Sequence, residues 1–241
     1  MLIKTNGIVL HTIPYSDTRI IAHLYTEAAG RLSCIATRTS GRRNTLSAAV
    51  FMPLSVIEAV IDDRPGRDLA RLRDARIVCP LPGLLADVVK SSLALFLAEV
   101  LFRMLREEGA DAGLFAFLTH SIRLLDGVEE GVANFHLVFL LRLLDHLGIY
   151  PNADSYSEGA WFDMQNGVFV SRPPLHRHFL DTDESRIFAS LLRISYGNMS
   201  LYSFSRADRA LILRKIISYY RLHIPGAPDI ISLPILQTLF D

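Results

Sequence analysis

The spacing of apolar residues changes at Pro80-Leu81-Pro82, and this change limits the possible folds more than any other feature of the chain. Before it, apolar residues recur at every second position between turn signals, as Ile20, Ala22 and Leu24 do. Side chains with this period lie on opposite faces of a strand. After it, apolar residues follow the spacing of a buried helix face. The sequence therefore predicts a β-rich part followed by a helical part.

Five short strands are expected in the first part, with turn signals at Pro14-Tyr15-Ser16-Asp17 and Ala28-Ala29-Gly30. The expected strands are 2–13, 19–26, 31–39, 50–61 and 69–78. Pro53 favours an edge position or a bulge within the fourth strand. Five strands in roughly 80 residues are typical of a small closed barrel such as the OB-fold, and closure removes exposed sheet edges.

Helices are expected throughout the second part, at 84–107, 111–125, 132–147, 181–193, 206–223 and 233–240. Capping-box pairs mark the start of two of them, Asp181 with Glu184 and Ser205 with Asp208. Residues 150–178 form a small irregular insert with a hairpin signal at Asn166-Gly167. We predict an α+β chain of two domains, an OB-fold barrel at 1–80 and an all-α helical domain at 81–241.

The charge is unevenly distributed along a chain that is neutral overall, with a pI near 7.1. Residues 1–79 contain 11 Lys and Arg against 7 Asp and Glu, whereas residues 80–241 contain 14 against 18. Most of the positive excess precedes residue 44. Such asymmetry predicts one basic binding module at the N-terminal end.

Six residues of this basic part are candidates for contact with nucleic acid. They are Arg19, Arg31, Arg38, Arg42, Arg43 and Tyr25. Guanidinium groups suit phosphate oxygens, and the rings of Tyr15, His23 and Tyr25 could stack on unpaired bases. Two interpretations stay open at this stage. The residues form a nucleic-acid-binding face, or they form a solvated charged loop on a stable barrel with Tyr25 in its core.

Catalytic and metal-binding motifs are not found in the sequence. It contains no phosphate-cradling glycine loop, no G-x-S-x-G and no H-E-x-x-H. His176 and His178 form an H-x-H pair without a third histidine or a cysteine nearby, which is too few ligands for zinc. Cys34 and Cys79 are too few for a disulfide framework or a cysteine zinc site. We predict a protein that is not an enzyme and uses no cofactor or metal.

No segment has the length and composition of a membrane span. The best candidate, Leu93–Phe102, is short and contains Glu99. Lys4 and Asn6 interrupt the N-terminus before the apolar core of a signal peptide could form. We expect a cytoplasmic protein with no membrane partner.

Several short motifs, in this order and spacing, resemble the bacterial RecO family of recombination mediator proteins. They are Gly7-Ile8-Val9-Leu10, Tyr15-Ser16-Asp17, Arg19-Ile20, Tyr25-Thr26, Gly30-Arg31-Leu32, Pro53-Leu54, Leu147-Gly148 with Pro151, Tyr219-Tyr220-Arg221-Leu222-His223 and Ile231-Ser232-Leu233. The resemblance spans nearly the whole chain. It implies an N-terminal OB-fold and a helical C-terminal domain in a nucleoid-associated cytoplasmic protein.

The resemblance also implies a function. RecO-like proteins bind single- and double-stranded DNA and anneal complementary strands. With RecR and the C-terminal tail of the single-strand-binding protein, they help to load RecA onto coated single strands. The resemblance implies a site for this tail in the helical part, where a cation faces an apolar groove. Arg103, Arg123 and Arg142 are the candidates, and each could equally be a surface charge or an ion-pair partner.

One departure from the family pattern concerns the insert. Many RecO-like proteins carry four cysteines there, which bind zinc, whereas this chain has Ser155, Ser157 and Ser171 and no cysteine. We infer an insert without zinc, held by the packing of aromatic residues such as Trp161 and Phe162. The alternative to the mediator function is an adaptor whose OB-fold binds only protein.

Overall fold

The computed structural model describes residues 1–37, 46–64, 66, 69–105 and 109–238. The chain divides into two compact units. The first contains Met1–Val128 and the returning segment from Ile230, and the second contains Glu129–Asp229. The predicted domains, 1–80 and 81–241, divide the chain by type of secondary structure rather than by compactness, and that division stays a prediction.

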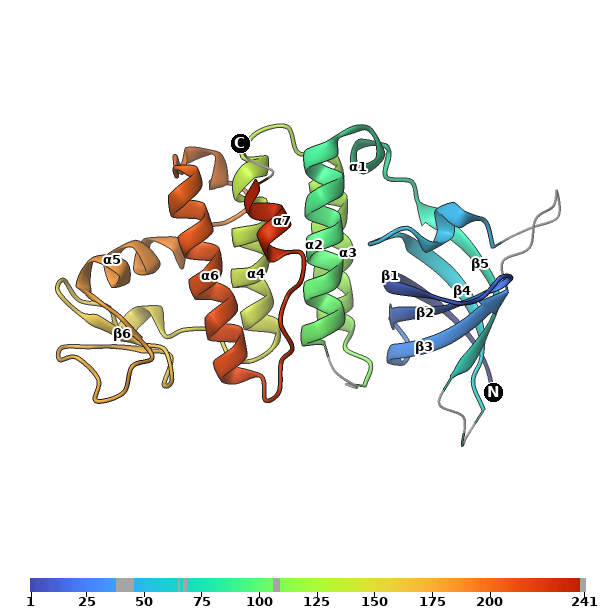
Figure 1. The fold of residues 1–241 in the computed structure, drawn as a ribbon, viewed down its shortest axis with the longest axis horizontal. Coiled ribbons are helices and arrows are strands. Elements are labelled where there is room, and N and C mark those ends of the chain that lie inside the picture. Colours follow the sequence, from blue (N-terminus) through green and yellow to red (C-terminus); the bar gives the residue numbers. More distant parts are fainter. Residues whose placement is uncertain (38–45, 65, 67–68, 106–108, 239–241) are drawn as a thin grey trace. The chain divides into compact units, whose positions relative to one another are not determined.

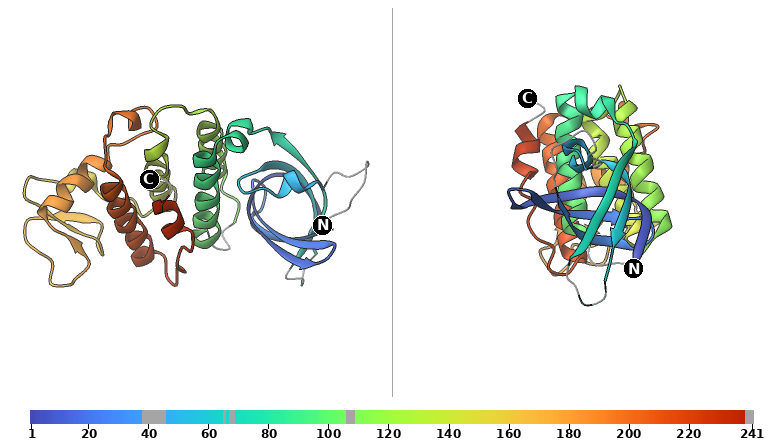
Figure 2. Two further views of the ribbon diagram at one scale, coloured as in Figure 1. Left: turned by 45° about the horizontal axis from the view of Figure 1, so that its top comes forward. Right: turned by 90° about the vertical axis from the view of Figure 1, so that its right-hand side faces the viewer.

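The first unit begins with five strands that close into a barrel (Figures 1 and 2). They are β1 (Leu2–Ser16), β2 (Arg19–Thr26), β3 (Gly30–Thr37), β4 (Val56–Asp62) and β5 (Ala70–Cys79). Their order around the barrel is β1-β2-β3-β5-β4, and every neighbouring pair is antiparallel except β3 with β5. The parallel pair joins Cys34 to Ala70 and Ile35 to Arg71. The predicted five-stranded, OB-like barrel is confirmed.

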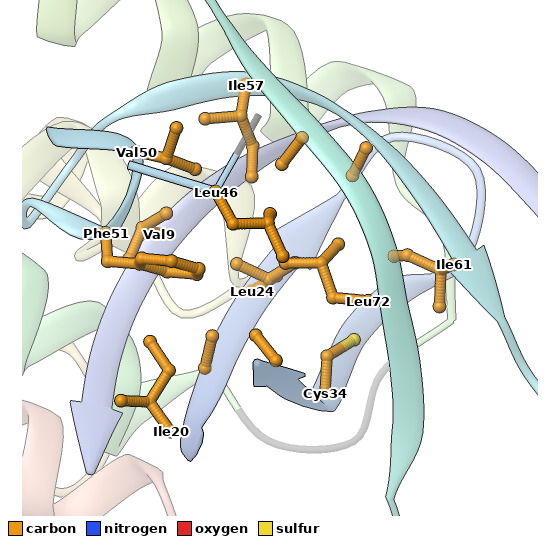
Figure 3. Close-up of a cluster of buried hydrophobic side chains, with 14 of the residues drawn as sticks. Val9, Ile20, Leu24, Cys34, Leu46, Val50, Phe51, Ile57, Ile61 and Leu72 are labelled. Carbon is orange, nitrogen blue, oxygen red and sulfur yellow. The ribbon is translucent and has the colours of Figure 1, made fainter. Parts of the chain in front are cut away.

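The barrel core follows the alternation seen in the sequence (Figure 3). On β2, Ile20, Ala22 and Leu24 are buried, and Cys34 and Ala36 face them from β3. Because these small and branched side chains interdigitate inside a closed sheet, the odd-numbered residues of β2 and β3 must point outward. The outward face is therefore set by the same pattern that builds the core.

Two predictions for the barrel are wrong in detail. The fourth strand begins at Val56, because Ala48–Phe51 forms a short 3-10 helix whose Val50 and Phe51 side chains enter the barrel core. Pro53 ends that helix, since proline has no N–H to donate, and Leu54 adopts a left-handed φ of 62°. The turn predicted at 14–17 is shorter than expected, because β1 continues to Ser16.

The α-helices in the described part of the first unit are α1 (Pro82–Ala86), α2 (Val88–Met104), α3 (Ala112–Gly127) and α7 (Leu233–Thr238). The single helix predicted at 84–107 is two helices, because the Asp87 side chain accepts hydrogen bonds from the amides of Val89 and Lys90 and starts α2. Side chains that cap a helix in this way satisfy amides that have no intrahelical partner.

The second unit packs around α4 (Phe135–His146), most of whose side chains are buried. Its other helices are α5 (Thr182–Leu191) and α6 (Arg206–His223), and both predicted capping boxes are present. The segment at 132–134 is a 3-10 turn rather than the start of α4. No helix in the described part of the chain is long and apolar enough to cross a membrane.

The insert contains a small sheet of β6 (Trp161–Asp163), β7 (Val168–Val170) and β8 (Phe179–Leu180), with β6 in the middle. Phe162 is fully buried, and its ring lies 4.8 Å from that of Phe169 and 4.7 Å from that of Phe188. Ser155 donates a hydrogen bond to the Asn152 carbonyl at 2.6 Å and accepts one from the Phe169 amide at 2.8 Å. Aromatic packing and a serine hydrogen bond therefore hold the insert.

Candidate nucleic-acid interface

The outer face of β1, β2 and β3 is covered at one end and open at the other. At the covered end, Tyr25 lies beside Phe115 of α3, with the ring centroids 6.5 Å apart. The rings of His11 and His23 pack on Phe102 of α2 at 4.6 and 4.8 Å. Side chains of this end of the sheet are thus in contact with helices of the same unit.

Beyond the two histidines, the same face carries a row of isoleucines. Ile13 of β1 is paired with Ile21 of β2, and Ile21 with Ile35 of β3. Ile13 is 41% exposed, and the other two are half-buried. Arg71 continues the row on β5, because it is the parallel partner of Ile35.

The next row along the strands is polar. Ser16, Arg19 and Thr37 are neighbours across β1, β2 and β3. Tyr15 lies between the two rows at an irregularity in the β1–β2 register, where Pro14 pairs with Ile20 and Ser16 with Arg19. The Tyr15 side chain is 58% exposed. An apolar strip bordered by a phenol ring and two arginines therefore forms the open end of this face.

Several other cations of the barrel that the structure describes are bound to protein acceptors. Arg73 and Arg64 bond to Asp62 at 2.5 and 3.3 Å, and Arg76 bonds to Glu58 at 2.9 Å. Lys4 lies 3.5 Å from the same Glu58 carboxylate. The hydrogen bonds from Arg73 and Arg64 lower the pKa of Asp62 to about 2. Arg19 and Arg71, in contrast, are exposed and make no ion pair with a described residue.

The structure places two of the predicted nucleic-acid contacts elsewhere. Arg31 donates hydrogen bonds to the carbonyls of Phe102, at 2.8 Å, and of Leu105 at the end of α2. Its guanidinium also lies 4.7 Å from the centre of the Phe102 ring. A cation here stabilises the carbonyl end of the helix, so Arg31 joins the barrel to α2 rather than facing solvent.

Tyr25 is only 1% exposed, so the predicted stacking of its ring on a base is not supported. The open interpretation that put Tyr25 among buried residues agrees with the structure, although the ring lies outside the barrel under α3. Of the predicted residues that the structure describes, Arg19 alone lies on the open face. Arg38, Arg42 and Arg43 lie outside the described residues.

Histidine charge adds little to this face. Burial, followed by the nearby Arg31 guanidinium and His11, lowers the pKa of His23 below its ordinary value of 6.5. His23 also makes a hydrogen bond to the Ser33 hydroxyl at 2.8 Å through Nδ1. The histidine is therefore neutral near pH 7, and the positive charge of the described face comes from arginine.

The three candidates for the partner-tail site do not share one environment. Arg103 on α2 bonds to Glu99 at 2.5 Å and is 19% exposed. Arg142 on α4 donates a hydrogen bond to the Ile194 carbonyl at 2.7 Å. Arg123 is exposed on α3 and makes no ion pair with a described residue.

No group of three or more possible metal ligands occurs among the described residues. His176 lies 3.2 Å from the Asp163 carboxylate, which also accepts hydrogen bonds from the amides of Gln165 and Asn166. The Asp163 side chain thus shapes the Asn166-Gly167 turn, where Gly167 has a left-handed φ of 66°. His176 of this histidine pair therefore contacts the carboxylate that shapes the turn.

Sequence reasoning missed Arg71 as part of this face. Its position follows from the parallel pairing of β3 with β5, which joins residues far apart in the chain. The sequence shows Arg71 only as one of three arginines in 71–76. Tyr15 had a usable signal, because it lies beside a proline in a turn-like segment, yet its exposure depends on the packing of its neighbours.

An OB-type barrel whose outer face is open at one end, followed by helices and a small insert, defines a class of two-part proteins built on an OB-fold. Comparison with protein families is more specific. Residues 1–81 match the family described as Recombination protein O N terminal, and residues 85–229 match Recombination protein O C terminal. The chain belongs to the RecO family.

Relatives of similar length align with this chain over its whole length. The DNA repair protein RecO of Bacteroides fragilis is 45% identical over 242 residues, and that of Phocaeicola vulgatus is 45% identical over 240 residues. The DNA repair protein RecO of Porphyromonas gingivalis is 37% identical over 246 residues. In each case the alignment covers 100% of both chains.

Proposed function

We propose that this protein acts in DNA repair as a recombination mediator that binds single- and double-stranded DNA and anneals complementary strands. Full-length relatives named DNA repair proteins support the repair role. The observation that carries DNA binding is the open outer face of the barrel, where Arg19 and Arg71 have no described carboxylate partner. A polyanion would supply the missing negative charge.

Annealing requires no bond to be made or broken by the protein. Holding two strands on one molecule raises their effective concentration, which is sufficient to speed their pairing. The phosphate contacts would be independent of sequence, because arginine forks bind phosphate oxygens without reading bases. We therefore propose a mediator that is not an enzyme and that works in the cytoplasm at the nucleoid.

Protein partners complete the proposal. RecR and the acidic, apolar tail of the single-strand-binding protein are the expected partners, and together they would help RecA load onto coated DNA. Of the candidate tail residues, Arg123 has the environment that suits such a contact, because it is exposed on α3 without a described ion pair. Arg103 and Arg142 already have acceptors within their own compact units.

Fluorescence anisotropy with a labelled single strand across a salt series tests the proposal. We expect binding whose log affinity falls with log salt by about 0.7 for each neutralised phosphate. Replacing Arg42 and Arg43 together with alanine should weaken binding and flatten that slope. An unchanged slope would remove the two arginines from the footprint.

The same experiment distinguishes the rival function. An adaptor that binds only protein would leave the anisotropy of every oligonucleotide unchanged at low salt, while still binding RecR or the tail peptide. Metal-dependent shortening of the oligonucleotide would instead indicate a nuclease and would contradict the mediator proposal.

A further inference from the structure

An apolar surface lies on the first unit where the end of β5, α1 and the start of α2 meet (Figure 1). Five large apolar side chains gather there, each between 40% and 73% exposed: Met52, Ile77, Leu85, Val88 and Leu95. We call this surface the α1 patch. Single exposed apolar residues are common on proteins, whereas a group of them in one place marks an interaction site.

The α1 patch surrounds a groove of about 510 Å³, which all of its residues except Val88 line. Val88 lies two turns before Leu95 on the same side of α2. On β5, Ile77 and Val78 are both exposed, although neighbouring residues of a strand point to opposite faces. This end of β5 is therefore open on both faces, and the groove is accessible to a partner.

The groove contains no charge that a polyanion could use. None of the described residues that line it is charged. The charged groups beside it already have contacts within the same unit. Arg76 bonds to Glu58 at 2.9 Å, the Asp87 side chain caps α2, and the buried Lys90 donates a hydrogen bond to the Asp126 carbonyl at 2.7 Å. An occupant that fits this chemistry presents an apolar, uncharged surface of its own.

We propose that the α1 patch is the contact between two copies of this chain, related by a two-fold axis. A two-fold contact uses the same surface on both copies, so that surface must contain both a hollow and a side chain that fills it. The α1 patch has the groove and, at its rim, the protruding Leu85 with Val88 next to it. Because the patch itself is uncharged, pairing two copies of it brings no like charges together.

The size of the surface predicts a weak dimer. The largest apolar patch on a monomer usually covers about 300–600 Å², whereas a specific complex buries about 800 Å² on each partner. Polar neighbours, such as the partly exposed Ser91 and Ser92 of α2, must then complete the contact. We expect a reversible equilibrium between monomer and dimer in the micromolar range.

A dimer would suit the proposed function, although the inference does not rest on that function. Two copies carry two of the barrels to which DNA binding is assigned, so each barrel can hold one strand. Holding both strands in one complex raises their effective concentration.

Sedimentation equilibrium of the full chain without DNA tests the proposal. The apparent mass should rise with concentration from 27.0 kDa toward twice that value. Leu85→Glu puts two carboxylates into an apolar contact, so it should raise the dissociation constant of the dimer at least about tenfold. Leu201→Glu is the matched control, because Leu201 is 80% exposed in the second unit, and it should dimerise like the wild type.

The Cys79 thiol gives a second measurement that needs no variant. This half-buried thiol lines the groove, so a second copy seated there should shield it. Its rate of labelling by an excess of thiol reagent should fall as the protein concentration rises through the range in which the mass increases. In Leu85→Glu, the labelling rate should lose this dependence on concentration.

Three results would overturn the proposal. The first is a wild-type mass that stays at 27.0 kDa up to about 100 µM, a range in which even weak specific interfaces associate. The second is an equal effect of Leu85→Glu and Leu201→Glu on the dimer. The third is a Cys79 labelling rate that ignores concentration while the mass rises, because the dimer would then use another surface. No DNA is present in these measurements, so the proposed function is tested separately.

Discussion

Replacing Arg31 with alanine should destabilise the fold and leave the affinity for DNA unchanged. The interactions that alanine removes include hydrogen bonds to the carbonyls of Phe102 and Leu105 and a cation–π contact with the Phe102 ring. All three lie at the last turn of α2, so their loss weakens the attachment of that helix to β3.

The magnitude follows from the individual contacts. A hydrogen bond from a charged donor contributes about 1.5–3 kcal/mol, but the site is half-buried, so water can replace part of each bond and the lower end applies. The cation–π contact adds about 0.5–1 kcal/mol. Together they predict a decrease of about 3.5–4 kcal/mol in the free energy of unfolding.

Urea unfolding followed by circular dichroism measures this decrease. Arg19→Ala is the matched control, because Arg19 is exposed on the neighbouring strand without a described ion pair, and its loss should change stability by less than about 0.5 kcal/mol. The reasoning is refuted if Arg31→Ala is as stable as the wild type but binds the labelled single strand more weakly. That result would return Arg31 to the DNA interface.

Two further predictions concern the first compact unit. Burial alone would raise the pKa of Glu99, but hydrogen bonds from Ser232, Ile231 and Arg103 together outweigh it and lower that pKa. The ionised Glu99 therefore stabilises the fold fully above pH 4.5, and this stabilisation is lost as the pH falls through the pKa that Glu99 has in the folded protein. Glu99→Gln should therefore speed amide exchange around residues 231–238 at pH 7; unchanged exchange would contradict this. Burial raises the pKa of the Cys34 thiol to about 12 and shields it from reagents, whereas the Cys79 thiol is only half-buried. A thiol reagent at pH 8 should therefore label Cys79 first, and Cys34 only after unfolding. Labelling of both cysteines at equal rates would show that the barrel core is open.

Local patterns were sufficient for much of the architecture. The bounds of β2 follow from the alternation of Ile20, Ala22 and Leu24, and the start of α6 follows from the capping box at Ser205 and Asp208. These predictions succeed because each depends on residues within one strand or one helical turn. The fourth strand was misjudged for the opposite reason. Val50 and Phe51 are apolar because their side chains pack in the barrel core from a 3-10 helix, and not because they belong to a strand.

The candidate site depended more strongly on tertiary structure. The sequence by itself predicted the closed barrel, the charge asymmetry between the two parts of the chain and the two possible environments of Tyr25. Only the folded structure decided that Tyr25 lies under α3, that Arg31 binds the end of α2, and that Arg71 joins Arg19 beside β3. The physical reason is that a charge or a ring is available to a ligand only if no protein group satisfies it first. Those competing groups are distant in the chain, so their positions are set by packing and strand pairing rather than by local sequence.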